Sequence, residues 1–133
     1  MAIYDIRCKD VARFLATGPK TLSEIGDRLH QLYPSLDPRG SYVREVLTDW
    51  NPFLVKVDGV FKLSDLGRAL ISLPGREGDE LTEDERAFML GVMMLDERQR
   101  KIICELILTG RSSASDAWVI NQTRRCLKDL GLL

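Results

Sequence analysis

Apolar residues recur at helical spacing, with polar residues between them, in three consecutive segments of the first half of the chain. In each segment apolar side chains recur every three or four positions, which places them on one face of a helix. The pattern predicts a first helix over residues 5–16, a second over 21–33 and a third over 38–50. The first half is therefore expected to fold around three amphipathic helices.

Residues with strong positional preferences mark the ends of these predicted helices. Thr21 precedes Glu24 by three positions, which is the spacing of a capping box. Asp37 before Pro38 is a favoured start for the third helix, and Pro52 ends it because proline restricts the residue before it.

A β-hairpin is predicted directly after the third helix. Residues 53–57 and 60–63 are rich in β-branched and aromatic side chains, and Asp58-Gly59 between them is a pair that type I′ turns favour. A short helix over residues 65–73 follows the hairpin.

The second half is predicted to be entirely helical. Residues 74–81 are rich in Gly, Pro and charge and are expected to form a linker between a domain over 1–73 and a unit over 82–133. Within the second unit, helices are expected over 82–95 and 97–108.

The last helical pattern, over residues 115–131, reads as one helix or as two short ones broken near Asn121. The helix before residue 95 is apolar nearly all round, and the side chains expected in the core are Phe88, Met89, Val92, Met93, Met94 and Leu95. A homodimer contact through the apolar helices of residues 87–108 is the alternative.

The charges are unevenly distributed, although the whole chain has a net charge of −1. Residues 1–76 carry 11 Lys and Arg against 9 Asp and Glu, residues 77–100 carry 3 against 8, and residues 101–133 carry 5 against 3. An acidic middle thus separates two mildly basic ends, and only these ends are candidates to face phosphate.

Composition also limits the location and the chemistry. The chain is 44% hydrophobic, without an apolar run that could span a membrane or serve as a signal peptide, so a cytoplasmic protein is expected. A single histidine, three scattered cysteines and the lack of a glycine-rich phosphate loop predict no metal site, no cofactor and no enzymatic activity.

The run YVREVLTDWNPFLVKVDGVFKLSDLGRAL, residues 42–70, resembles the end of a winged helix-turn-helix domain, in which a recognition helix leads into a hairpin wing. RRCLKDLGLL at residues 124–133 is similar to the close of a recognition helix. The resemblance implies a mainly α protein with an N-terminal winged helix and a C-terminal unit like a wingless helix-turn-helix. The order of elements after the hairpin is also distantly similar to the recognition region of some type IIS restriction endonucleases.

With that architecture, helical geometry selects the candidate contacts to double-stranded DNA. Val43, Val46, Leu47 and Trp50 form the expected buried face of the third helix, and the polar side chains opposite them are available to bases and phosphates. The predicted DNA-binding residues are Arg39, Ser41, Tyr42, Arg44 and Thr48 in the third helix, Lys20 and Thr21 before the second, Lys56 and Lys62 in the hairpin, and Asn121, Arg124, Arg125 and Lys128 in the last helix.

Two functions remain open from the sequence. The first is double-stranded DNA binding, as a transcriptional regulator or as the recognition part of a larger DNA-processing system. The second is a winged-helix protein-interaction module in a multisubunit assembly, which the near-neutral charge and Glu45 on the predicted DNA-facing side favour.

Overall fold

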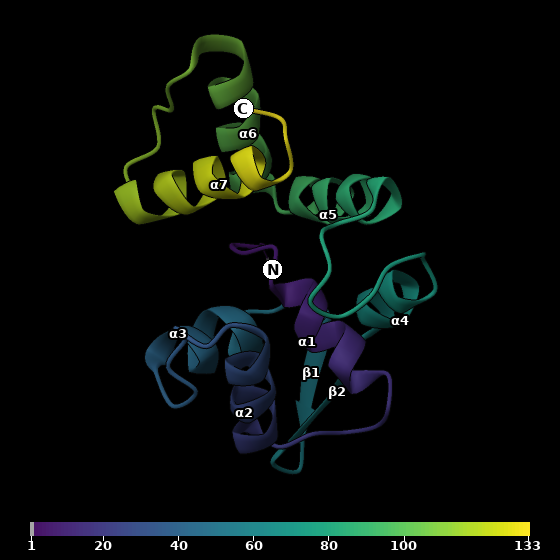
Figure 1. Cartoon of the computed structure of the whole chain (residues 1–133). Helices are drawn as coiled ribbons and strands as arrows, with labels where there is room; N and C mark the ends of the chain where they lie inside the picture. The colour runs from purple at the N-terminus through teal and green to yellow at the C-terminus, as the bar shows by residue number, and fades with distance from the viewer. Residues whose placement is uncertain (1) are drawn as a thin grey trace.

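A computed structural model describes residues 2–133 of the chain as a mainly helical protein with one two-stranded hairpin (Figure 1). The elements α1 to α4 and the hairpin form the lower half in this view, and α5 to α7 form the upper half. Their bounds are α1 Cys8–Leu15, α2 Leu22–Leu32, α3 Ser41–Arg44, the π-helical turn η1 Glu45–Asp49, β1 Leu54–Val57, β2 Val60–Leu63, α4 Asp65–Ile71, α5 Glu83–Leu95, α6 Glu97–Thr109 and α7 Ala117–Asp129.

Helix α2 begins as its sequence predicts. The Thr21 hydroxyl accepts a hydrogen bond from the Glu24 backbone N–H at 3.2 Å, and the Glu24 carboxylate accepts one from the Thr21 N–H at 3.0 Å. This confirms the capping box, which satisfies two backbone donors that the helix itself leaves unpaired. A second capping box, between Thr82 and Glu85, starts α5 in the same way.

The predicted hairpin is also confirmed. Leu54 pairs with Leu63 and Val57 with Val60, so the two strands meet at Asp58-Gly59. Both turn residues have positive φ, 51° and 80°, which is the conformation that a type I′ turn requires. An isolated bridge between Lys20 and Phe61 fixes the second strand to the segment before α2.

The third helix differs from its prediction. Asp37 and Pro38 do not start it: α3 begins at Ser41 with Gly40 as its N-cap, and the Asp37 side chain instead accepts a hydrogen bond from the Arg39 N–H at 2.9 Å. The helix then widens into η1, where the Trp50 N–H reaches the Glu45 carbonyl at 2.8 Å.

Thr48 explains why the helix widens at this point. Its hydroxyl donates to the carbonyls of Val43 at 2.8 Å and Arg44 at 2.7 Å, so a side chain satisfies backbone acceptors that a regular α-helical turn would pair differently. Asn51, fully buried, then bonds the backbone of Cys8, Leu47 and Phe53 and fixes the chain as it enters β1.

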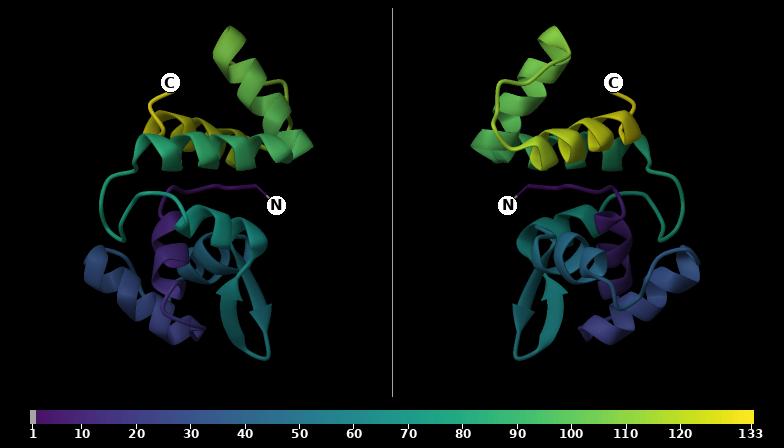
Figure 2. Two further views of the ribbon diagram at one scale, coloured as in Figure 1. Left: turned by 90° about the vertical axis from the view of Figure 1, so that its right-hand side faces the viewer. Right: turned by 90° about the vertical axis from the view of Figure 1, so that its left-hand side faces the viewer.

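The N-terminal segment joins the two halves. In Figure 2 it runs between α1 and the helices α5 and α7. Ile3 is completely buried there, and its carbonyl accepts a hydrogen bond of 2.8 Å from the buried Gln99 side chain of α6. The buried residues of both halves thus belong to one continuous hydrophobic core.

Charged residues of α1 hold the segment 74–81 against the first half. The buried ammonium group of Lys9 donates to the carbonyls of Arg76 and Asp79, each at 2.6 Å, and lies 3.1 Å from the Asp10 carboxylate. Asp10 also accepts a 2.8 Å hydrogen bond from the Gly78 N–H. The predicted linker is therefore bound to α1 through its backbone.

A second charged pair extends this contact into α5. The Arg13 guanidinium donates to the carbonyls of Ile71 and Leu73 and lies 3.1 Å from the carboxylate of Glu85, which is fully buried. Glu85 is also the residue that completes the Thr82 capping box, so one carboxylate serves the helix start and the contact between halves.

The apolar face of α5 lies in the core, as expected: Met89 and Met93 are completely buried. The prediction for Leu95 is wrong, because this last residue of α5 keeps 70% of its surface exposed. Ile107 and Leu108 of α6 are exposed as well, the latter with 81% of its surface accessible. Across residues 2–133, the helices lack the length and apolar character needed to cross a membrane.

Candidate nucleic-acid interface

The outward side of α3 and η1 carries only some of the side chains predicted for it. Ser41 and Arg44 are exposed, and so is the acidic Glu45 between the predicted contacts. The prediction that Thr48 faces outward is wrong, because 99% of its surface is covered and its hydroxyl bonds the backbone of the helix itself. Trp50, expected in the core, keeps 38% of its surface exposed.

Arg39 lies before α3 rather than in its first turn. Its guanidinium is 3.0 Å from the Asp27 carboxylate of α2, and both side chains are more than half exposed. Such a solvent-exposed ion pair is worth about 0–1 kcal/mol, so a phosphate or base can replace Asp27 at little cost. Residues 37–49 carry two arginines against three carboxylates, so this surface has no excess of positive charge.

Tyr42 points away from α3 toward the N-terminal segment. Its hydroxyl donates to the carboxylate of Asp5, and the nearby Tyr33 hydroxyl donates to that of Asp10. Burial raises the pKa of Asp5 above its ordinary value, although the backbone N–H and guanidinium of Arg7 act in the opposite direction. The two tyrosines therefore connect the end of α2 and α3 to two buried carboxylates, Asp10 in α1 and Asp5 just before it.

Arg7 is held in place by the same tyrosines. Its guanidinium carbon lies 4.7 Å from the centre of the Tyr33 ring, and its Nη1 donates to the Tyr42 hydroxyl at 3.3 Å. Stacking of this kind fixes the plane of a guanidinium group. The Nη1 atom also lies 3.8 Å from the Asp5 carboxylate, which compensates part of the positive charge of Arg7.

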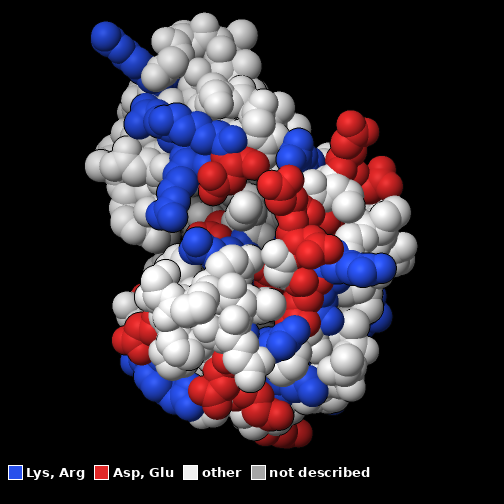
Figure 3. All heavy atoms as spheres, viewed as in Figure 1, with Lys and Arg blue, Asp and Glu red and all other residues white. Residues whose placement is uncertain are grey.

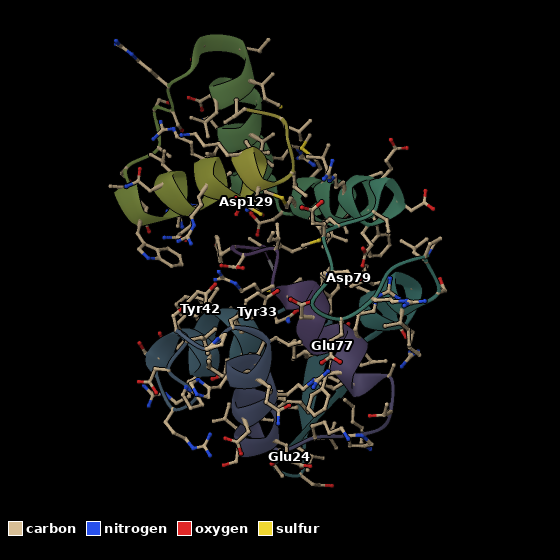
Figure 4. All side chains as sticks on the ribbon, in the orientation of Figure 1. Glu24, Tyr33, Tyr42, Glu77, Asp79 and Asp129 are labelled. Atoms are coloured by element: carbon tan, nitrogen blue, oxygen red, sulfur yellow. The ribbon has the colours of Figure 1, made fainter. Side chains whose placement is uncertain are left out.

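Arg7 and Arg125 line one open cleft of about 420 Å³ between the two halves, which we name the α3–α7 cleft. Tyr33, Tyr42 and Ser41 line it as well, and Asp37 is the one carboxylate in its lining. Figure 4 shows both tyrosines at the top of the lower half, facing the α7 side, and Figure 3 shows basic and acidic side chains around the hollow between the halves. Two guanidinium groups and several hydroxyls are suited to an anion such as phosphate.

The α3–α7 cleft brings together residues that the sequence placed on separate surfaces. Ser41 and Tyr42 belong to the predicted recognition helix, whereas Arg125 belongs to the last helix. Arg7 and Tyr33 were not predicted as site residues. Their signal in the sequence is weak, because a single arginine before a helix and a tyrosine at a helix end have many structural roles.

The two hairpin lysines lie on opposite faces. Lys56 pairs with Phe61 in the strand register, and its ammonium group lies 5.6 Å from the centre of that buried ring, whereas Lys62 pairs with the exposed Val55. Side chains of neighbouring positions alternate across a strand, so a duplex along one face of the hairpin meets only one of them directly.

The residues before α2 that were predicted to contact DNA are less accessible than expected. Lys20 is partly buried and its ammonium group lies over the Phe14 ring at 4.9 Å. Thr21 is exposed, but its side chain is engaged in the capping box.

The polar face predicted for the last helix lies along the single helix α7. Asn121, Arg125 and Lys128 are exposed, and Arg124 is partly buried and donates to the Asn121 side chain at 3.3 Å. The helix is continuous through Asn121, which decides between the one-helix and two-helix alternatives.

Two of the three cysteines, Cys8 and Cys126, are buried, and Cys104 is exposed. Burial raises the pKa of Cys8 well above its usual range and that of Cys126 to about 12, so both thiols are protonated and unreactive at neutral pH. Over the part of the chain that the structure describes, His, Cys, Asp and Glu side chains form no group of three that could hold a metal ion.

Comparison of the chain with protein-family models, with curated proteins and with solved structures finds no match.

Proposed function

We propose that this protein binds double-stranded DNA, with residues 2–73 acting as a winged helix and Arg125 of α7 completing the binding surface. In this proposal α3 faces the major groove and the hairpin is the wing. The order of three helices, hairpin and a further helix supports it, as does the exposure of Ser41 and Arg44.

The observation that carries the proposal is the α3–α7 cleft. It joins the start of α3 to the basic face of α7, with Arg7 already oriented by Tyr33 and Tyr42. A phosphate of the duplex backbone in this cleft accepts hydrogen bonds from Arg7, Arg125 and the Ser41 hydroxyl, while Arg44 reaches a base edge or a neighbouring phosphate.

The acidic side chains next to these groups set the strength of binding. Glu45 and Asp49 oppose phosphate, so nonspecific affinity is low, and Glu45 accepts a hydrogen bond from cytosine N4 when the base sequence allows it. With about four phosphate contacts, the logarithm of the binding constant falls with the logarithm of the salt concentration with a slope of about −3 to −4. The protein then acts as a regulator or as the recognition part of a larger DNA-processing system.

The experiment is a fluorescence-anisotropy titration of labelled random duplexes at low salt, with Arg44→Ala beside the unmodified protein. We expect binding that weakens by about 1–3 kcal/mol in the variant on a selected site. No binding at low salt, or identical binding by Arg44→Ala on that site, would reject the proposal.

A protein-interaction function is the second candidate, and the exposed side chains of Leu95, Ile107 and Leu108 favour it. Apolar groups of this size gain free energy when another surface covers them. A homodimer through the α5–α6 region, or a partner in a multisubunit assembly, would provide that cover. Sedimentation of the protein and of Leu108→Asp distinguishes the first case: a dimer that this substitution dissociates supports it, and a monomer at high concentration rejects it.

A further inference from the structure

Three aromatic side chains from distant parts of the chain meet at the surface. Tyr4 comes from the N-terminal segment, Trp50 from the end of η1, and Trp118 from the start of α7. Their ring centres are 5.1 to 6.3 Å apart, and each pair is arranged edge to face with interplanar angles of 62° to 82°. Trp50 and Trp118 remain 38% and 42% exposed.

Edge-to-face packing leaves ring faces available. Three edge-to-face contacts cover at most three of the six faces of these rings, and the remaining faces carry the negative end of the ring quadrupole. Such faces attract cations, tryptophan most strongly.

The rings line an open pocket of about 420 Å³, the aromatic pocket, whose only charged lining residues among those described are Asp96 and Asp116. Each of these carboxylates caps a helix with one oxygen: Asp96 accepts from the Gln99 N–H at 2.8 Å, and Asp116 accepts from the Val119 N–H at 3.2 Å. The backbone thus fixes both carboxylates beside the rings.

One cation of the chain itself already borders this pocket. Arg98 lies 3.3 Å from the second oxygen of Asp116, and its side chain is 57% exposed. Within residues 2–133, Asp96 forms no ion pair of this kind, although Arg98, Arg100 and Lys101 line a neighbouring surface hollow together with it. Burial raises the pKa of Tyr4, and the carboxylates of Asp96 and Asp116 act in the same direction while Arg98 acts against them.

We propose that the aromatic pocket binds an arginine side chain of a partner polypeptide. The planar guanidinium stacks on a free ring face and donates to Asp96, a combination that an anion or an uncharged apolar group cannot reproduce. A polypeptide is favoured over a small free cation because the pocket is open, and further residues beside the arginine can contact the surrounding surface. This binding is separate from the DNA surface of the α3–α7 cleft.

Intrinsic fluorescence tests the proposal directly, because the two tryptophans of the chain are the two in the pocket. The probe is a blocked tetra-arginine peptide, with the uncharged tetra-citrulline peptide as its matched control. We expect a saturable change of tryptophan emission with the arginine peptide only. No saturable change, equal binding of the citrulline peptide, or equal binding of tetramethylammonium would overturn the proposal.

Variants locate the binding within the pocket. Asp96→Asn removes the charge but keeps the helix cap, since asparagine caps as well as aspartate, and Glu97→Gln removes a neighbouring exposed charge outside the pocket. We expect weakening of about fivefold to thirtyfold for Asp96→Asn and Trp118→Ala, and less than about twofold for Glu97→Gln.

Arg98→Ala provides the opposite change. It removes the competing guanidinium beside Asp116, so the arginine peptide should bind more tightly, while circular dichroism reports that the fold is unchanged. Equal loss in Asp96→Asn and Glu97→Gln would mean that the peptide senses only general negative charge, and weaker binding by Arg98→Ala would contradict a shared site; either result overturns the proposal.

Discussion

Helices α1 and α7 both have an apolar face and a charged face, but the charged side chains are buried on α1 and exposed on α7. On α1, Lys9 and Asp10 are almost completely buried beneath the segment 74–81. On α7, Arg125 and Lys128 remain exposed, and Arg125 lines an open cleft. A charged helix face therefore becomes a binding surface or a structural contact according to what the rest of the chain places over it.

The largest expected effect comes from breaking the buried pair on α1. Asp10→Ala leaves the Lys9 ammonium group without its carboxylate and the Gly78 N–H without an acceptor, and should lower the free energy of unfolding by about 3–5 kcal/mol. Urea denaturation measures this loss. The double variant Lys9→Met/Asp10→Leu is the control and should cost less than Asp10→Ala, because no unpaired charge remains; a loss below 1 kcal/mol in Asp10→Ala would contradict the role given to this pair.

Glu85 allows a matched test of burial within one helical turn. Glu85→Gln removes the charge that faces Arg13 in a fully buried position, and should cost about 1.5–3 kcal/mol in urea denaturation. Glu83→Gln, exposed in the first turn of the same helix, should change stability by no more than about 0.5 kcal/mol. If Glu85→Gln and Glu83→Gln lowered the free energy of unfolding equally, the ion pair between Glu85 and Arg13 would not contribute to stability.

Thr48 and Ser41 extend the comparison to the third helix. Thr48→Val keeps the volume but removes two hydrogen bonds of η1, so stability should fall by about 1 kcal/mol while duplex affinity of the folded protein stays constant. Ser41→Ala should leave stability unchanged and weaken duplex binding. If Thr48→Val weakened duplex binding and Ser41→Ala lowered stability instead, Thr48 rather than Ser41 would contact the DNA.

The smallest effects concern three carboxylates at helix and loop ends, of which Glu24 is exposed and Glu105 and Asp116 are partly buried. Hydrogen bonds from the backbone N–H groups of Thr21, Ser113 and Val119, respectively, lower the pKa values of Glu24, Glu105 and Asp116. Because the folded pKa values lie below the unfolded ones, the stability from these bonds is present above about pH 4.5 and is lost as the pH falls through the folded values. Thermal unfolding between pH 5 and 3 should show a weaker pH dependence for Glu24→Gln than for the unmodified protein, and an identical dependence would refute the contribution of Glu24.

Local features of the fold were predictable because they depend on residues close in sequence. The Thr21 capping box and the Asp58-Gly59 turn each need only a few neighbouring positions. The widening at η1 was not predictable from apolar spacing, since it depends on where the Thr48 hydroxyl finds its acceptors.

The candidate site was only partly predictable for a related reason. Ser41, Arg44 and Arg125 were selected from helical geometry and are exposed, but the cleft that joins Ser41 to Arg125 also needs Arg7, which is far from both in the sequence. Its position depends on the way the N-terminal segment passes between the two halves, and no local pattern encodes that path.

The salt dependence of duplex binding for Arg7→Gln, Arg125→Ala and the double variant tests most directly whether both halves contact one DNA molecule. If they do, each single substitution lowers the magnitude of the salt slope by about one, and the double variant lowers it by about two. A slope that Arg125→Ala leaves unchanged, while Arg7→Gln lowers it, would contradict a shared surface across the α3–α7 cleft.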